Sequence, residues 1–482
     1  MIESPLLPHH QNYIDGRWVD GTSGRLLQVI NPATGELLTE ISEAGPGDAA
    51  QAIESADKAS RVEHSLEERR NWLKNIHEGL TEYREELARI ITLEQGKPLA
   101  ESRAEVDYGA GFFRYFSEHI EHLKPRDISV PGQPNQWRVY YRPAGVAALI
   151  TPWNFPLAMF GKKFAPSIAT GCGSVTKPAS QTPLTAIAVH TLAERAGLPP
   201  GQANLVMGPG SSLGPMLCSH PSVRIISCTG STETGKTLLR LSADHVKKTA
   251  LELGGNAAFI VLEDANLDVA ADSLMINKFR CAGQTCVCAN RVFVHETVIA
   301  GFRKKLVDRL SKLAVGNGMD PSVQIGPLID SFALRKVKEL VDDAVSQGAR
   351  ITFGSLPEVP GESWGAFCPP ILLEDVTDSM AICQEEIFGP VVSILAFRTE
   401  EEVIRRADST PYGLAGYLFT GNPGRAERLA AQIRCGHIGV NTGSGPVPDA
   451  PFGGMKQSGL GREGGLEGLF EYTEPQTVVS RS

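Results

Sequence analysis

The stretch that decides the fold runs from Val146 to Pro156 and reads Val146-Ala147-Ala148-Leu149-Ile150-Thr151-Pro152-Trp153-Asn154-Phe155-Pro156. Its first five residues are all apolar, which is typical of a short strand covered on both faces, and a helix-like segment follows Pro156. Four more short runs alternate with helix-like stretches farther along the chain, at 173–176, 204–207, 223–226 and 257–261. This alternation predicts a parallel sheet with right-handed crossovers.

A second alternating series runs from Leu267 to Val440, with helices expected at Leu267–Arg280, Val298–Leu313 and Ala333–Gln347. At roughly 150 residues per domain, a chain of 482 residues holds about three structural units. Two separate α/β units therefore fit the length better than one large sheet.

The segments that flank the two series predict a helical region and isolated strands. Tyr13–Val19 carries an Asp-Gly turn between apolar-rich arms, and the apolar side chains of residues 48–122 recur largely at helical spacing. Trp137–Tyr141 is β-rich, and the tail at 470–479 resembles an isolated edge strand. Unpaired edges accept another chain, so we expect these two strands to mediate subunit contacts in a homodimer or homotetramer.

Composition and charge exclude several classes of protein. Apolar residues make up 42% and charged residues 21%, which is ordinary for a globular protein. The net charge of −9 leaves no basic excess for neutralising phosphates, so we expect neither nucleic acid nor an anionic membrane as partner. The first residues have no signal-peptide pattern, and the longest apolar stretch, 144–160, is interrupted by Pro152, Asn154 and Pro156, which argues against a membrane span.

Cysteine usage indicates a reducing compartment. The nine cysteines are too sparse for a disulfide scaffold, and their number is odd. We therefore expect a cytoplasmic protein in which a thiol is free to act as a nucleophile. The 49 glycines and 32 prolines predict many tight turns and close backbone approaches, so loops are expected to carry the function.

Three cysteines gather in the segment Phe279–Arg291, and the pattern leaves three interpretations open. A thiol between Arg280 and Arg291 can have a lowered pKa, as a nucleophile needs. The cysteines can equally be small buried hydrophobic residues. A metal site with His295 as fourth ligand is the third interpretation, although Cys286 and Cys288 are spaced more tightly than paired ligands usually are.

Two further polar residues follow apolar strands. Glu252 stands between two leucines before a Gly-Gly turn, an apolar setting that would raise its pKa toward use as a general base, or it is a solvated residue at a strand end. Asn154 lies at the carboxyl end of the strand that begins at Val146, where an amide can stabilise an oxyanion or simply form a turn.

A glycine-rich stretch and a lysine suggest anion binding. Thr229–Gly235 lies between a strand and a helix and offers backbone N–H groups to an anion such as a pyrophosphate, although it lacks the G-x-G-x-x-G pattern. Lys177 closes an earlier strand, where it either faces the same anion or is solvated.

The joint occurrence of these motifs resembles the aldehyde dehydrogenase superfamily over nearly the whole chain, from Tyr13 to Thr477. The motifs that carry the resemblance are Thr151–Pro156, Lys177–Ser180, Thr229–Gly235, Glu252–Gly255, Gly283–Cys286, Glu385–Pro390 and Pro451–Gly454. Within the family, residues 279–291 and 456–464 look most like the succinate-semialdehyde dehydrogenase branch.

The resemblance implies a fold with three parts. These are a Rossmann-like cofactor-binding domain (1–124, 143–251 and 439–469), an α/β catalytic domain (252–438) and a small β oligomerisation element (125–142 and 470–482). It also implies NAD- or NADP-dependent oxidation of a small-molecule aldehyde to the acid through a cysteine thiohemiacetal and thioester.

The resemblance further implies roles for individual residues. Cys286 matches the nucleophile, Asn154 the oxyanion-stabilising amide and Glu252 the base that activates water. The residues that match cofactor-binding positions are Trp153, Lys177, Ser180, Gly230, Ser231, Leu253, Glu386 and Phe388. Among these, Lys177 and Glu386 match the residues that hold the adenosine and nicotinamide riboses. No metal is implied.

Departures from the family pattern bear on cofactor and substrate. Ser180 stands where strictly NAD-using members often carry a glutamate, so NADP is expected to be tolerated. Arg280 matches one of the two arginines with which the semialdehyde branch grips a distal carboxylate, but Lys162 replaces the other and loses the bidentate fork. The usual serine pair is absent before Pro451, and Ser444 is the candidate replacement. We expect an anionic tail on the aldehyde, succinate semialdehyde or a different acidic aldehyde.

Cys288 is expected to cap Cys286 as a strained, reversible disulfide, or to be a buried thiol. Cys228 replaces an aromatic residue common before Thr229, and nothing in the sequence explains the change. Two competing functions stay open: a CoA-acylating dehydrogenase of the same fold, which usually lacks the residue seen here as Glu252, and a non-catalytic structural protein.

Overall fold

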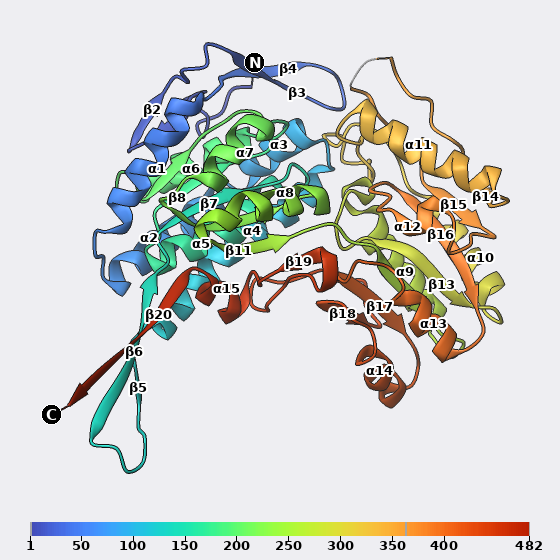
Figure 1. Cartoon of the computed structure of the whole chain (residues 1–482). Helices are drawn as coiled ribbons and strands as arrows, with labels where there is room; N and C mark the ends of the chain where they lie inside the picture. The colour runs from blue at the N-terminus through green and yellow to red at the C-terminus, as the bar shows by residue number, and fades with distance from the viewer. Residues whose placement is uncertain (1, 362–363, 482) are drawn as a thin grey trace.

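The computed structural model describes residues 2–361 and 364–481 and shows two α/β bodies with a narrow β arm projecting from the first (Figure 1). The first body is built on an eight-stranded sheet in the order β19-β11-β10-β7-β8-β9-β1-β2. Its five central strands are parallel, and β1, β2 and β19 add antiparallel edges. The strands are β1 (Asn12–Ile14), β2 (Arg17–Val19), β7 (Val146–Ile150), β8 (Ser174–Lys177), β9 (Ala203–Leu205), β10 (Val223–Thr229), β11 (Lys248–Glu252) and β19 (Gly459–Leu460).

Helices cover both faces of this sheet. They are α1 (Pro46–Ser60), α2 (Leu66–Glu82), α3 (Arg84–Gln95), α4 (Leu99–His119), η1 (Ile120–Leu123), α5 (Pro156–Thr170), α6 (Leu184–Arg195), α7 (Gly210–Ser219), α8 (Thr232–Ser242), η2 (Ala243–His245) and α15 (Gly465–Glu471). Side chains of β7 alternate between the two cores: Ala147 and Leu149 pack toward α2–α6, whereas Val146 and Ala148 pack toward α1, α7 and α8. Since both faces are buried, the strand is apolar throughout, as its sequence predicted.

The second body holds a seven-stranded sheet in the order β14-β15-β16-β13-β12-β17-β18, parallel except for β14. Its strands are β12 (Ala257–Val261), β13 (Ala289–His295), β14 (Arg350–Phe353), β15 (Ile371–Glu374), β16 (Val391–Phe397), β17 (Ala415–Phe419) and β18 (His437–Val440). Its helices are α9 (Leu267–Phe279), η3 (Arg280–Gly283), α10 (Ile299–Leu310), α11 (Ser331–Ser346), α12 (Ala381–Gln384), α13 (Glu400–Ala407) and α14 (Pro423–Ala430), with η4 (Lys456–Ser458) in the returning segment. The predicted α/β class with two sheets is confirmed.

The arm is a three-stranded sheet of β5 (Arg126–Ile128), β6 (Asn135–Pro143) and β20 (Thr473–Arg481), in the order β20-β6-β5. A separate hairpin pairs β3 (Leu26–Ile30) with β4 (Leu37–Ser42). The tail is an edge strand, as predicted, but it is not isolated, because β20 pairs with β6 from Thr473↔Pro143 to Arg481↔Asn135. β6 and β20 satisfy each other's backbone hydrogen-bonding groups. In the described part of the chain, the outer edges of β5 and β20 in this sheet have no neighbouring strand.

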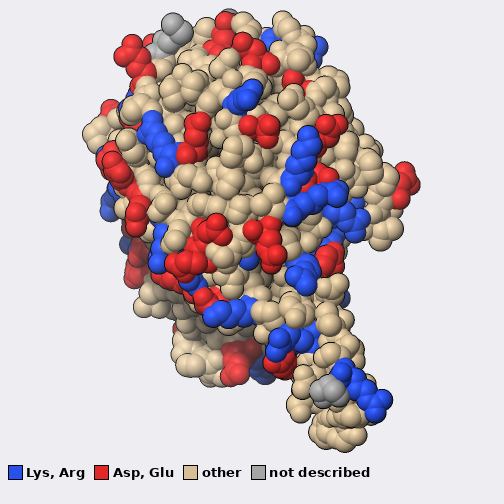
Figure 2. All heavy atoms as spheres, turned by 90° about the vertical axis from the view of Figure 1, so that its left-hand side faces the viewer, with Lys and Arg blue, Asp and Glu red and all other residues tan. Residues whose placement is uncertain are grey.

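The surface charge and the helices bear on the expectations about nucleic acid and membranes. On the face that includes the arm, lysine and arginine residues are interspersed with aspartate and glutamate, without a wide basic region (Figure 2). Among the residues that the structure describes, no helix combines the length and apolarity needed to cross a bilayer.

Candidate active site

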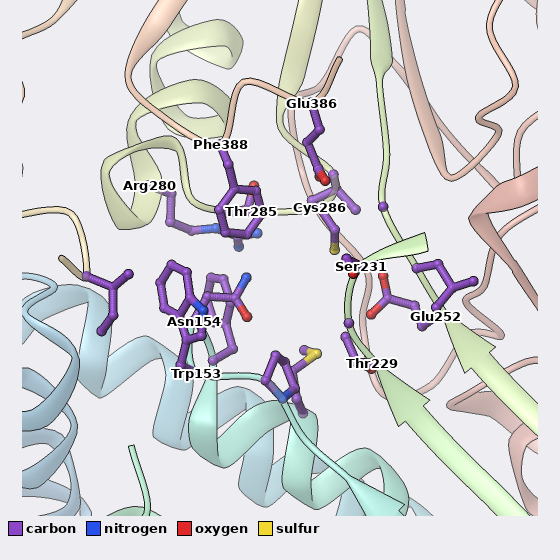
Figure 3. A pocket seen from close by; sticks show the side chains of 18 of the residues that line it. Trp153, Asn154, Thr229, Ser231, Glu252, Arg280, Thr285, Cys286, Glu386 and Phe388 are labelled. Atoms are coloured by element: carbon purple, nitrogen blue, oxygen red, sulfur yellow. The ribbon is translucent and has the colours of Figure 1, made fainter. Parts of the chain in front are cut away.

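A cavity of about 640 Å³ lies where the two bodies face each other, within the size range of small-molecule sites. One wall comes from the carboxyl ends of β7, β10 and β11, which bring Asn154, Ser231 and Glu252 together. The opposite wall comes from the loops after η3 and α12, which carry Cys286 and Glu386 (Figure 3). The carboxyl ends of parallel strands are where α/β proteins place ligands.

A left-handed turn positions Cys286. Cys281, Ala282 and Gly283 have φ values of 52°, 53° and 76°, a conformation that non-glycine residues rarely adopt in succession. The Glu101 carboxylate holds this turn by accepting the Cys281 backbone N–H at 2.7 Å. A β-carbon on Gly283 would lie 2.3 Å from a backbone carbonyl oxygen, so only glycine fits there.

The Gly-Gly step after Glu252 allows two loops to meet at the site. The Gly255 N–H donates to Glu386 Oε1 at 3.2 Å. A β-carbon on Gly254 would lie 3.1 Å from Glu386 Oε2, and one on Gly255 would lie 2.2 Å from the Cys286 carbonyl oxygen. The glycines therefore set how closely the nucleophile loop and the Glu386 loop approach β11.

The thiol environment of Cys286 differs from the one expected. Burial, followed by the negative charge of Glu252, raises the pKa of Cys286 well above its usual range. The prediction of a lowered pKa was wrong because neither arginine hydrogen-bonds the sulfur among the described residues. Arg291 is buried and donates to Asn256 and to carbonyl groups near α13, whereas Arg280 lies over the Phe155 ring at 5.2 Å.

The other two cysteines of the segment are buried. Cys281 lies beside Gln95, whose Nε2 donates to its sulfur at 3.2 Å, and burial raises its pKa to about 12. The Cys288 sulfur contacts the carbonyl oxygens of Lys278 and Ala289 at 3.9 and 3.7 Å, outside the cavity wall. A disulfide between Cys286 and Cys288 stays a prediction.

The geometry does not support a metal site formed by the clustered cysteines and His295. His295 shares hydrogen bonds with Thr297 Oγ1 and the Arg398 carbonyl oxygen, at 2.9 and 3.0 Å. Within residues 2–361 and 364–481, no three histidine, cysteine, aspartate or glutamate side chains gather as metal ligands would.

Glu252 is neither solvated nor in a purely apolar setting. Its side chain is 1% exposed, and the Lys162 ammonium group donates to its Oε2 at 3.3 Å. Its Oε1 has no hydrogen-bond partner among the described residues, and both carboxylate oxygens face the cavity region around the Cys286 sulfur (Figure 3). One oxygen is thus anchored and the other is free.

A buried network of charges extends from Glu252. Lys162 Nζ lies 2.6 Å from Glu463 Oε2, and Lys163 pairs with the other oxygen of Glu463. Lys163 also donates to Thr229 Oγ1 at 2.8 Å. Sequence reasoning missed Lys163 and Glu463, although two adjacent lysines in the otherwise apolar helix α5 were a signal of buried charge.

Two neighbours hold Asn154 in place, one through its side chain and one through its backbone. Its Nδ2 donates one hydrogen bond to the Gln284 carbonyl oxygen at 2.8 Å, which leaves its second N–H free. Its backbone carbonyl oxygen accepts from the buried Lys97 ammonium group at 2.6 Å. The amide therefore occupies a fixed place in the wall of the cavity beside Cys286 (Figure 3).

Several residues predicted to bind the cofactor line the same cavity: Trp153, Gly230, Ser231, Leu253, Glu386 and Phe388. Trp153 and Phe388 meet edge to face at 5.6 Å, and Phe388 has a left-handed φ of 53°. Burial raises the pKa of Glu386 to about 8. Ser231 caps α8, accepting the Thr234 N–H at 3.2 Å, so the helix begins beside the cavity wall that Gly230 and Ser231 form.

Lys177 and Ser180 lie outside the cavity wall, beside the loop that follows β9. Lys177 is buried, so the solvated interpretation was wrong, and burial lowers its pKa to about 8. Its ammonium group donates to the Pro178 carbonyl oxygen at 2.7 Å, and Ser180 Oγ donates to the Gly208 carbonyl oxygen at 3.1 Å.

The three predicted substrate residues fare differently. Arg280 lines the cavity, and among the described residues no group hydrogen-bonds its guanidinium. Lys162 also lines the cavity, but two carboxylates already engage its ammonium group. Ser444 is exposed, shares a 2.8 Å hydrogen bond with Thr442 Oγ1 and does not reach the wall, which Pro446 forms instead. The wall residues that sequence reasoning missed include Glu101, Tyr108, Phe155, Met159 and Phe452.

Comparisons with known proteins identify the family to which the sequence is similar. A family model described as the aldehyde dehydrogenase family matches residues 18–478. A 3-sulfolactaldehyde dehydrogenase of Pseudomonas putida is 43% identical over 479 residues, 99% of this chain and 98% of that protein. The succinate-semialdehyde dehydrogenase (NADP(+)) of Escherichia coli strain K12 is 43% identical over 468 residues, 96% of each chain. A crystal structure described as an oxidoreductase from Marinobacter aquaeolei superposes with a TM-score of 0.97 at 50% identity, covering 100% of both chains.

Proposed function

This chain belongs to the aldehyde dehydrogenase family, and we propose that it oxidises an acidic semialdehyde to the carboxylic acid with Cys286 as nucleophile. Membership makes it an oxidoreductase that acts on a small-molecule aldehyde and uses NAD or NADP. The observation that carries the proposal is the convergence of Cys286, Asn154 and Glu252 on one cavity that also contains an unpaired guanidinium, that of Arg280.

The first step needs a nucleophile and a place for negative charge. The Cys286 sulfur, as thiolate, attacks the aldehyde carbon and forms a thiohemiacetal whose oxygen carries the charge. The free N–H of Asn154 is the donor that stabilises this oxyanion, and the Cys286 backbone N–H is the second donor in our proposal. Burial and the charge of Glu252 raise the pKa of Cys286, so the thiol must first lose its proton, which passes to water in our proposal; Glu252 acts as a base in the second step.

The residues around the cavity fit a dinucleotide. The buried Glu386 carboxylate keeps acceptor capacity for ribose hydroxyls beyond its bond from Gly255, and the start of α8 at Ser231 offers N–H groups to a pyrophosphate. When bound, NAD or NADP accepts the hydride that leaves the substrate carbon. Lys177 and Ser180, which lie outside the cavity wall beside the loop after β9, are proposed to face the adenosine ribose. The small Ser180 leaves room for a 2′-phosphate, so both cofactors are proposed to work.

The second step is hydrolysis of the thioester. Glu252, with Oε1 free and Oε2 held by Lys162, is placed to take a proton from a water molecule that attacks the acyl carbon. The presence of this buried base supports hydrolysis rather than acyl transfer to CoA.

The Arg280 guanidinium in the cavity supports an anionic substrate tail. Arg280 presents a planar set of donors with no hydrogen-bonded carboxylate, and carboxylate or sulfonate oxygens satisfy such donors well. The similar proteins from Pseudomonas putida and Escherichia coli are named for aldehydes that carry such groups. Ser444 is exposed and lies outside the cavity wall, so we assign the tail to Arg280.

We further propose a cytoplasmic homodimer or homotetramer with the domain division expected from sequence. Residues 1–124, 143–251 and 439–469 would bind the cofactor, and 252–438 would carry the catalytic cysteine. The edges of β5 and β20 would mediate subunit contacts, which the exposed Val478 and Val479 on the arm support.

The experiment is a panel of acidic, sulfonated, aliphatic and aromatic aldehydes, each assayed with NAD and NADP, with and without CoA. We expect the largest kcat/KM for an anionic aldehyde, turnover without CoA, and measurable rates with both cofactors. Activity that requires CoA, or a preference for neutral aldehydes, would contradict the proposal. Complete rejection of NADP would remove the role given to Ser180.

A further inference from the structure

Lys162 lies in the wall of the cavity, and its position differs from that of a substrate-binding cation. It belongs to α5, a helix whose fifteen residues are all buried, and its own side chain is 2% exposed. The ammonium group lies between two carboxylates, 3.3 Å from Glu252 Oε2 and 2.6 Å from Glu463 Oε2, and 5.3 Å from the centre of the Phe452 ring. Carboxylates of the protein itself thus already pair with the Lys162 ammonium group.

The charges around Lys162 balance without a substrate. Lys162 and Lys163 carry two positive charges, and Glu252 and Glu463 carry two negative charges, in one group joined by ion pairs. Burial acts against the charged form of Lys162, but the attraction of Glu463 and Glu252 exceeds it, and the pKa of Lys162 is raised. A substrate carboxylate drawn to Lys162 would add a third negative charge to a neutral buried group, which low-dielectric surroundings disfavour.

Arg280 provides the contrast. It lines the same cavity, and in the described part of the chain no ion pair or hydrogen bond engages its guanidinium. Lys336 also lines the cavity, and its ammonium group lies 3.8 Å from Glu385 Oε2. Lys162 and Lys336 thus have carboxylates of the protein beside them, whereas the Arg280 guanidinium is open to a ligand.

Glu252 depends on Lys162 for its only ionic partner among the described residues. Glu463 keeps Lys163 if Lys162 is removed, whereas the Glu252 carboxylate would be left buried beside Cys286, with Glu386 and Tyr108 as the other titratable groups near it. A buried carboxylate without a counter-charge takes up a proton, and a protonated Glu252 cannot act as a base.

We infer that Lys162 is a positioning residue for Glu252, which it holds charged and with Oε1 turned free, and that Arg280 alone binds the anionic tail of the substrate. The inference rests on the proposed function, because it assigns Lys162 to the hydrolysis step of that reaction. It replaces the earlier expectation that Lys162 grips the substrate.

The test compares Lys162→Met with Lys162→Arg, each assayed on an acidic semialdehyde and on a neutral aldehyde of similar length. For Lys162→Met we expect kcat to fall by about tenfold or more for both aldehydes, with similar KM values, since a positioned base contributes about 10²–10⁴ in rate. The burst of reduced cofactor should remain while steady turnover slows. Lys162→Arg keeps the charge and should retain more turnover.

The pH dependence of kcat distinguishes loss of the charge from a packing defect, because a packing defect alone does not shift it. A buried cation beside a carboxylate favours its charged form, so the acidic limb of the kcat profile should shift to higher pH in Lys162→Met and stay near wild type in Lys162→Arg. Near-native melting temperature and cofactor binding establish that each variant is folded.

Two results would overturn the inference. One is a KM that rises only for the acidic aldehyde while kcat and the pH profile stay unchanged, which would make Lys162 a substrate-binding residue. The other is a Lys162→Met variant that behaves as wild type. Neither outcome touches the proposed function, which the substrate panel on the wild-type enzyme tests separately.

Discussion

Gly255 packs so closely against Cys286 that a β-carbon at residue 255 would lie 2.2 Å from the Cys286 carbonyl oxygen. The same glycine donates its N–H to Glu386, so one residue without a side chain fixes the spacing between the nucleophile loop and the loop expected to hold the cofactor. The site is thus built by backbone contacts as much as by reactive side chains.

Gly255→Ala is expected to displace the Cys286 loop, because the added methyl group meets the backbone of Cys286, three residues before β13 begins. We expect kcat/KM to fall by about tenfold or more, with a lower melting temperature, as overpacking costs roughly 1–3 kcal/mol. Steady-state kinetics and thermal unfolding check this. Gly47→Ala is the matched control: a β-carbon there meets open space at the start of α1, so activity should not change.

Asn154→Ala removes the amide whose second N–H is free beside Cys286. An oxyanion-hole donor typically contributes about 10²–10³ in kcat, so we expect a loss of this size with little change in cofactor affinity. Steady-state assays and cofactor titration measure the two quantities. Wild-type kcat in this variant would mean that Asn154 only shapes the turn after β7.

Arg280→Met tests the recognition of the anionic tail. A hydrogen bond to a charged group contributes about 1.5–3 kcal/mol, so the KM for an acidic semialdehyde should rise roughly ten- to hundredfold. A neutral aldehyde has no partner for the guanidinium, and its KM should stay close to wild type. Equal effects on both aldehydes would show that Arg280 supports the loop rather than the substrate.

The thiol of Cys286 should react slowly with iodoacetamide near neutral pH when no cofactor is bound. Burial first, and then Glu252, disfavour the thiolate, so its population rises only at pH values above the ordinary thiol pKa. Glu252→Gln removes the second cause and should shift the inactivation profile to lower pH. The other eight cysteines are buried, and Cys286→Ala controls for any labelling of them. An unchanged pH profile of inactivation in Glu252→Gln would contradict the effect of Glu252 on the Cys286 thiol.

Much of this arrangement could be predicted from sequence because it depends on local patterns. The apolar run at Val146 indicated a strand buried on both faces, and β7 has this form. Cys286, Glu252 and Asn154 follow strands or turns whose positions the sequence marks, and the fold brings all three to one cavity.

What could not be predicted depends on contacts between distant residues. Lys162 pairs with Glu252, 90 positions away, and with Glu463 near the other end of the chain, so a lysine that resembled a substrate ligand has protein partners instead. The pKa of Cys286 follows burial and a neighbouring carboxylate rather than the arginines adjacent in sequence. The tail strand β20 gains its partner β6 only when residues some 330 positions apart meet.

The central claim is that Cys286 forms a thioester that Glu252 hydrolyses, and a single-turnover measurement on Glu252→Gln tests it most directly. Mixed rapidly with saturating cofactor and an acidic semialdehyde, this variant should release a burst of reduced cofactor close to one equivalent per active site. Steady turnover afterwards should be at least about 10²-fold slower than wild type, while Cys286→Ala gives neither burst nor turnover. Full steady turnover by Glu252→Gln, or any dehydrogenation by Cys286→Ala, would contradict the account.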